Sequence, residues 1–144
     1  MVRYSKRFVD SRLNGSEHYY DVIDIILRSK DFDEGLEFYG VGRKIFLAYI
    51  FCDLIATTMR SGVEPFYELE HDFAVTIQKA IRTEGYIDIA NALKFGEVNV
   101  NNEGDMEKIK QWIYENEEYL NETIRKLLNE EKSKVYQLCR VTEA

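Results

Sequence analysis

The sequence predicts an all-α protein, a single compact multi-helix domain of five or six helices over residues 1–144. One proline and eight glycines leave few obligatory breaks, and good helix formers such as Leu, Lys and Glu are plentiful. Apolar residues recur three or four positions apart along much of the chain, which places them on one helix face. With 45% hydrophobic residues, a chain of this length can bury one sizeable core.

The N-terminal third is expected to hold one helix between less regular segments. Residues 1–12 are predicted to be flexible. The helix follows Asn14 or Ser16, each of which is a suitable cap, and ends near Lys30. Residues 31–39 are predicted to form a charged connector, with a helical turn as the alternative.

The middle of the chain predicts three helices. Residues 43–60 should form the most buried one, because apolar side chains occupy nearly all of its faces. Glycine and proline within residues 61–65 mark the strongest break. A helix over 68–83 should end at Gly85, and a shorter helix should run from residue 86 or 87 to about residue 95.

Residues 96–104 are rich in asparagine, glycine and acidic residues, which predicts a flexible loop. Helical spacing returns from residue 105 onward, and the sequence does not decide whether residues 116–119 link two helices or lie within one. The apolar stripe from Leu120 to Leu138 could be buried inside the monomer or across a homodimer.

The formal charge of −7 is distributed unevenly. Residues 1–60 carry nine acidic and nine basic side chains, whereas residues 61–144 carry seventeen acidic and ten basic ones. Within residues 61–122 alone, fourteen acidic side chains face five basic ones. Such a segment repels phosphate and attracts basic proteins, so no direct nucleic-acid binding is expected there.

The chain is expected to be cytoplasmic. Residues 1–10 lack the apolar core of a secretory signal. The longest apolar stretch, residues 45–56, is interrupted by Asp53 and is shorter than the roughly 20 residues that span a bilayer. In this compartment Cys52 and Cys139 are expected to be reduced core residues, and a disulfide is the less favoured alternative.

One dense cluster of possible metal ligands occurs at Glu64, Glu68, Glu70, His71 and Asp72. Glu68 and His71 form a Glu-x-x-His pair, which also occurs in di-metal helical bundles. Such a bundle needs a second pair and two more carboxylates, and the only other histidine, at position 18, is not three residues after a glutamate. The cluster is therefore interpreted as an acidic helix start.

Neither a cysteine next to a histidine nor a phosphate-binding glycine loop is present in the sequence, so no catalytic, cofactor or metal residue is predicted. An enzyme whose site assembles only in three dimensions remains an alternative. A deep pocket that collects His71, Cys52 or Asp53 would favour it.

Glu115, Glu118 and Glu122 stand at positions i, i+3 and i+7. These carboxylates are therefore expected to line one helix face, about 5–6 Å apart per step. Phosphates along a DNA strand repeat on a comparable scale. A row of this kind can imitate DNA to a basic groove.

The segment from Phe46 to Leu93 shows a distinctive order of features. An apolar helix containing Asp53 precedes the turn Arg60-Ser61-Gly62-Val63-Glu64-Pro65-Phe66-Tyr67, and after a helix come Glu84-Gly85-Tyr86 and Ile89-Ala90-Asn91-Ala92-Leu93. This order resembles the bacterial DNA-mimic domain family over about a third of the chain. That helical, acidic family is named for a member that presents carboxylates as a DNA substitute and occupies a transcription regulator. The resemblance implies a protein-binding inhibitor or regulator.

These features predict a non-enzymatic acidic protein that binds a basic, nucleic-acid-binding protein, such as a transcription regulator or an antiviral nuclease. The alternative is an immunity protein that neutralises a toxin by direct binding. The carboxylates expected to form the negative face are Glu64, Glu68, Glu70, Asp72, Glu115, Glu117, Glu118 and Glu122. Aromatic residues near the breaks are further contact candidates: Tyr39, Phe66, Tyr67, Tyr86 and Tyr119.

Overall fold

The computed structural model describes residues 3–15, 18–29 and 41–142. Within these ranges it contains nine α-helices, one short 3-10 helix and one pair of two-residue strands. The all-α prediction is confirmed, but five or six helices are too few for the described residues. The cap at Ser16, the connector at residues 31–39 and the contact candidate Tyr39 lie outside the described residues.

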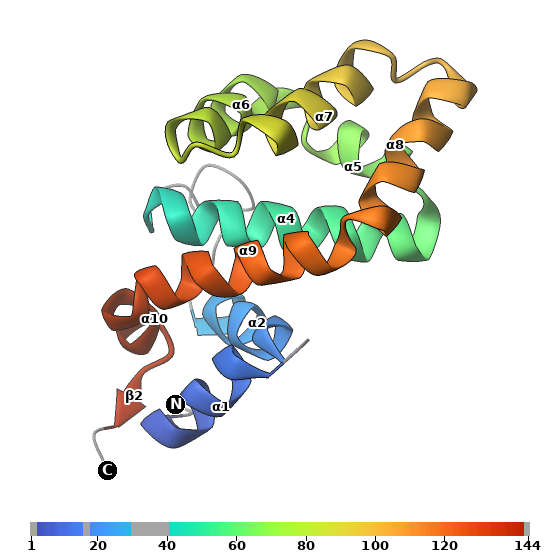
Figure 1. Ribbon diagram of the computed structural model, residues 1–144. Helices are drawn as coiled ribbons and strands as arrows, with labels where there is room; N and C mark the ends of the chain where they lie inside the picture. The colour runs from blue at the N-terminus through green and yellow to red at the C-terminus, as the bar shows by residue number, and fades with distance from the viewer. Residues whose placement is uncertain (1–2, 16–17, 30–40, 143–144) are drawn as a thin grey trace. The chain divides into compact units, whose positions relative to one another are not determined.

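The chain divides into two compact units, unit 1 (residues 1–49 and 121–144) and unit 2 (residues 50–120). The helices are α1 (Lys6–Asn14), α2 (Tyr19–Ser29), α4 (Arg43–Ser61), α5 (Glu64–Leu69), α6 (Ala74–Thr83), α7 (Ile87–Val98), α8 (Glu103–Glu115), α9 (Glu117–Glu130) and α10 (Lys132–Leu138) (Figure 1). The 3-10 helix η1 covers His71–Phe73, and strands β1 (Tyr4–Ser5) and β2 (Val141–Thr142) pair in parallel.

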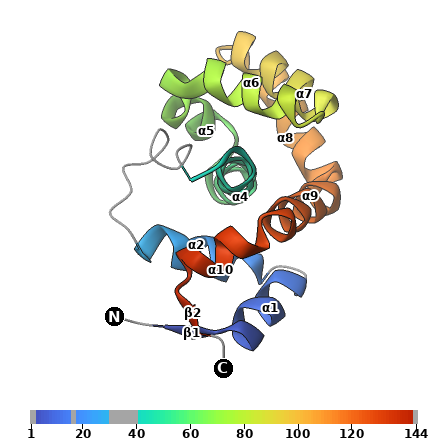
Figure 2. The same cartoon turned by 90° about the vertical axis from the view of Figure 1, so that its left-hand side faces the viewer.

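Unit 1 begins with regular structure where residues 1–12 are predicted to be flexible. The Ser5 hydroxyl accepts a hydrogen bond from the Phe8 amide at 3.1 Å, which caps α1. Val9 and Leu13, four positions apart, are fully buried and hold this helix to the unit. β1 precedes α1 and lies beside β2 (Figure 2).

Polar contacts join the helices of unit 1. The Arg12 guanidinium on α1 lies 3.1 Å from the Asp21 carboxylate on α2. The Tyr19 hydroxyl on α2 donates a hydrogen bond to Asn121 on α9. The second contact joins residues that are 102 positions apart in the sequence.

Unit 2 contains a break that the sequence does not predict. The expected helix over 68–83 is divided into α5, η1 and α6, because Glu70 and Phe73 adopt ψ angles of 7° and 6° instead of helical values. Pro65 lies in the first turn of α5, where proline is favourable, so this helix starts earlier than expected. The predicted breaks at Gly62 and Gly85 are confirmed, and both glycines have a φ of +86°.

The expected loop over 96–104 is reduced to residues 99–102. α7 continues through Gly96 to Val98, and α8 begins at Glu103, where the Asn102 side chain accepts a hydrogen bond from the Asp105 amide at 3.0 Å. α6 and α7 lie side by side (Figures 1 and 2). A Gln78 amide that donates to the Ala90 carbonyl at 2.9 Å joins them.

The predicted apolar stripe of the C-terminal helices is buried within the chain. Its members are Leu120, Ile124, Leu127, Leu128, Val135 and Leu138. Cys52 and Cys139 are also buried, as the sequence predicts. Among the helices that the structure describes, none has the length and apolarity to cross a bilayer.

Asp10 links α1 to α10 in unit 1. Its carboxylate accepts a hydrogen bond from the Tyr136 hydroxyl and lies 3.5 Å from the Lys132 ammonium. The hydrogen bond from Tyr136 and the positive charge of Lys132 together lower the pKa of Asp10 below its ordinary 3.8. A depressed pKa in the folded state means that ionised Asp10 stabilises the fold.

We expect Asp10→Asn to lower the free energy of unfolding at pH 7 by about 1 kcal/mol, because it removes the ionised acceptor. The contribution is present above the unfolded pKa and is lost as pH falls through the folded pKa, so the two proteins should converge below pH 3.8. Urea unfolding across this pH range measures the effect. Asp24→Asn, which disrupts an exposed pair with Arg28, is the control and should cost less than about 0.5 kcal/mol. Equal losses in both variants would contradict the role of Asp10.

Candidate functional site

The net negative charge of the chain lies in unit 2. This unit carries fourteen acidic and six basic side chains, a net charge of −8, whereas unit 1 carries twelve acidic and thirteen basic ones, a net charge of +1. The charge asymmetry along the sequence therefore coincides with the division of the fold.

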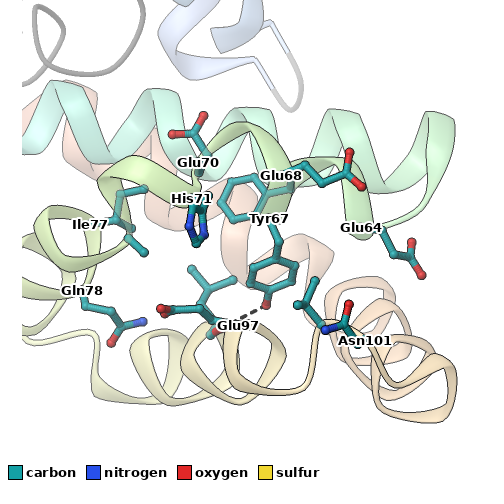
Figure 3. Close-up of a pocket in the computed structure, with 13 residues that line it drawn as sticks. Glu64, Tyr67, Glu68, Glu70, His71, Ile77, Gln78, Glu97 and Asn101 are labelled. Carbon is teal, nitrogen blue, oxygen red and sulfur yellow. Dashed lines mark hydrogen bonds between the residues drawn. The ribbon is translucent and has the colours of Figure 1, made fainter.

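Most of the predicted acidic residues are accessible, but they do not form one uniform face. Those that are exposed in unit 2 are Glu64, Glu68, Asp72, Glu115 and Glu118. Glu117 is half-buried, and the exposed Glu122 belongs to unit 1. Glu70 is a correction, because only 8% of its surface is exposed. It projects from the opposite side of its segment to His71 and Tyr67 (Figure 3).

The predicted row of Glu115, Glu118 and Glu122 is not a single helix face. α8 ends at Glu115, and Asn116 leaves the helical conformation with a ψ of 15°. The backbone N–H of Asn116, at 3.0 Å, and its side-chain amide, at 2.8 Å, both donate to the Trp112 carbonyl at the end of the helix. Glu118 and Glu122 share a face of α9, while Glu115 belongs to the preceding helix.

Large apolar side chains are also exposed in unit 2. Among the described residues they are Met59, Leu69, Val75, Ile87, Phe95, Val98, Tyr114 and Tyr119, and all of them belong to this unit. Ile87, Phe95 and Val98 fall on one face of α7, because they are eight and eleven positions apart. Val98 is 69% exposed. Contiguous exposed apolar surface marks sites of contact, and the face of α7 that carries Ile87, Phe95 and Val98 is the candidate for such surface in unit 2.

A cavity of about 410 Å³ opens in unit 2 (Figure 3). α5, η1 and the first half of α6 form one wall, and the C-terminal half of α7 with the following loop forms the other. Its lining residues are Glu64, Phe66, Tyr67, Glu68, Glu70, His71, Ala74, Ile77, Gln78, Leu93, Glu97, Val100 and Asn101. The volume lies in the range of about 300–1,000 Å³ that is usual for ligand pockets.

Tyr67 bridges the two walls. Its hydroxyl donates a hydrogen bond to the Leu93 carbonyl on α7 at 3.0 Å. Burial, and then the negative charge of Glu97, raise the pKa of Tyr67 well above its ordinary value. The hydroxyl therefore stays protonated and keeps donating to α7.

Gly96 allows this close approach. A β-carbon at residue 96 would lie 1.9 Å from the Tyr67 hydroxyl oxygen and 2.5 Å from Tyr67 Cζ. Only a residue without a side chain fits there. The sequence predicts a loop that begins at Gly96, but this glycine lies inside α7 and allows Tyr67 to pack against the helix. An isolated glycine among helix-forming residues is the sequence signal for such close packing.

The polar lining of the cavity is dominated by hydrogen-bond acceptors. Gln78 donates its amide N–H to the Ala90 carbonyl, while its buried Oε1 atom accepts no hydrogen bond from any residue that the structure describes. The Glu97 carboxylate lies 3.6 Å from the Lys94 ammonium, whose side chain is 53% exposed. Among the described residues that line the cavity, none is Lys or Arg.

The groups that could support catalysis or metal binding are scattered. His71 lines the cavity, but Cys52 and Asp53 lie on α4 and are not among the lining residues. Glu68 and His71 are divided between α5 and η1. Over residues 3–15, 18–29 and 41–142, no three His, Cys, Asp or Glu side chains are placed to hold a metal ion. Burial raises the pKa of the Cys139 thiol to about 12.

No protein-family model, curated protein or solved structure matches this chain. The features that bear on its function are therefore the charge, the exposed apolar side chains and the cavity of unit 2.

We expect Gly96→Ala to lower the free energy of unfolding by about 1–3 kcal/mol, because the added methyl group displaces Tyr67. Helix propensity alone predicts the opposite sign, a gain of up to about 1 kcal/mol. Gly104→Ala on the exposed start of α8 is the matched control, since its nearest neighbour is the Asn102 side chain at 3.3 Å. Urea unfolding of both variants decides the matter, and a stabilised Gly96→Ala protein would refute the close approach.

Proposed function

We propose that this protein is a non-enzymatic binding protein whose unit 2 binds a basic protein. The observation that carries the proposal is the coincidence of a net charge of −8 with exposed apolar side chains in one unit. Protein interfaces combine apolar and aromatic anchors with a polar rim. Carboxylates around such anchors steer a basic partner into place and disfavour acidic ones.

A nucleic-acid-binding protein is the partner that this surface fits best. The groove of such a protein is basic because it neutralises phosphates, so carboxylates compete directly with nucleic acid for it. The exposed acids Glu64, Glu68 and Asp72 come from one short segment, and Glu115 and Glu118 flank another helix junction. The resemblance of residues 46–93 to the DNA-mimic domain family supports the same proposal. On this basis the protein inhibits a transcription regulator or an antiviral nuclease.

The exposed apolar residues favour a second candidate, an immunity protein in a dedicated complex with a toxin. Leu69, Val75 and Val98 are 62%, 82% and 69% exposed. Burial of such side chains against a partner is not screened by salt, in contrast to pairing between exposed charges. The salt dependence of binding therefore separates the two candidates.

The test is capture of partners from a bacterial lysate by the tagged protein at low salt, followed by measurement of affinity for the purified partner. We expect Asp72→Asn, Glu115→Gln and Glu118→Gln together to weaken binding about tenfold, at roughly 0.5 kcal/mol for each exposed charge. None of these residues lines the cavity. The matched control removes three negative charges from unit 1 with Asp24→Asn, Glu130→Gln and Glu131→Gln and should leave the affinity unchanged.

Release of the partner by raised salt and by added DNA would support mimicry of nucleic acid. A single partner that resists both would support the immunity complex. Equal affinity for the unit 2 variant and the control variant would overturn the proposal that the acidic surface of unit 2 binds the partner.

A further inference from the structure

The cavity of unit 2 combines an apolar floor with acceptors at its edges. Phe66, Ile77 and Leu93 contribute apolar surface, and the carboxylates of Glu64, Glu68 and Glu97 belong to the lining. The buried Gln78 Oε1 atom adds an acceptor to which none of the described residues donates. A complementary ligand has an apolar body, several N–H donors and a positive charge.

A guanidinium group fits this description better than an ammonium group. It carries five N–H donors in a plane and no acceptor, so it can serve acceptors that come from different helices. It is also weakly hydrated and stacks on aromatic rings. The rings of Phe66 and Tyr67, which both belong to the lining, are nearly perpendicular, at 79° with 5.6 Å between centroids.

We propose that the cavity is an arginine-binding site. The guanidinium of the ligand is held by Glu97 and Gln78, its methylene groups pack on the apolar floor, and the exposed Glu68 adds negative charge at the edge of the cavity (Figure 3). This inference rests on the proposed function for the source of the arginine, which is a side chain of the basic partner. Lys94 does not block the site, because its own side chain is 53% exposed and an ion pair with so exposed a lysine contributes little.

The experiment uses small probes and needs no partner. Butylguanidinium, butylammonium and the neutral, planar butylurea are titrated into the isotope-labelled full chain, and amide chemical shifts are followed by NMR. We expect saturable shifts at Tyr67, His71, Ala74, Leu93 and Glu97, and an affinity for butylguanidinium at least about tenfold higher than for butylurea, since a desolvated charge pair is worth more than a neutral hydrogen bond. Equal affinity for the charged and neutral probes, or shifts that do not saturate, would overturn the site.

Two kinds of variant test the assignment of residues. Glu68→Gln with Glu97→Gln keeps the shape of the lining and should lower the affinity for butylguanidinium about tenfold. Ala74→Leu narrows the cavity and should weaken butylguanidinium and butylurea alike. Glu107→Gln on the exposed face of α8 removes one charge away from the cavity and should change nothing. An unchanged affinity in the first variant would refute the proposed role of the carboxylates.

The experiments distinguish failure of the arginine-binding site from failure of the proposed function. Binding of butylguanidinium by a chain that captures no basic protein would refute the proposed function and assign the site to a free guanidine. A partner whose affinity falls in the Asp72, Glu115 and Glu118 variant but not in the Glu68 and Glu97 variant would refute anchoring by arginine and leave the acidic interface in place.

Discussion

Tyr67 sets the distance between α5 and α7, and the cavity of unit 2 depends on that distance. Its ring is a stiff spacer with few rotamers, held at its tip by the Leu93 carbonyl at 3.0 Å. A buried hydroxyl without an acceptor would cost about 1–3 kcal/mol, so the ring is fixed at both ends. Gly96 then allows α7 to touch the ring without closing over it. The space beside Tyr67 remains open because the two walls cannot move closer.

The break between α5 and α6 gives this space its curvature. Tyr67, His71, Ala74 and Gln78 follow the spacing i, i+4, i+7 and i+11, which would place them on one face of a straight helix. Glu70 and Phe73 interrupt the helix, so the same stripe lines a concave surface. The non-helical turn also buries Glu70 and separates it from the exposed acids around it. The same interruption of the helix thus curves the wall of the cavity and buries Glu70, the one predicted acidic residue that is not accessible.

Much of the fold could be predicted because local rules decide it. The apolar residues of α4 act through periodicity, and Gly62 and Gly85 act through backbone sterics. The structure has the expected breaks at both glycines. α1 was harder to predict, because a nine-residue helix is unstable without tertiary packing. The sequence features that indicate this helix are the Ser5 cap and the apolar pair Val9 and Leu13. They are weak indications, because the sequence does not show which residues pack against the pair.

The site could be predicted only in part, since its contacts are long-range. The acidic composition and the contact candidate Tyr67 are visible in the sequence. The pairing of Tyr67 with Leu93, which are 26 residues apart, is not visible. The continuity of a helix through Gly96 and its end at Asn116 depend on neighbours in space and on side-chain capping. Burial of Glu70 likewise reverses the ordinary expectation that a glutamate is solvated.

The charge of unit 2 also bears on how its apolar side chains can remain exposed. Exposed residues such as Leu69, Val75 and Val98 would favour association with further copies of the same surface. A net charge of −8 on the same unit opposes that contact, because two such surfaces repel each other. A basic partner is attracted by the negative charge of unit 2, and this attraction brings the exposed apolar side chains into contact with it. The carboxylates therefore contribute to specificity in two ways, because they repel further copies of the same acidic surface and attract a basic partner.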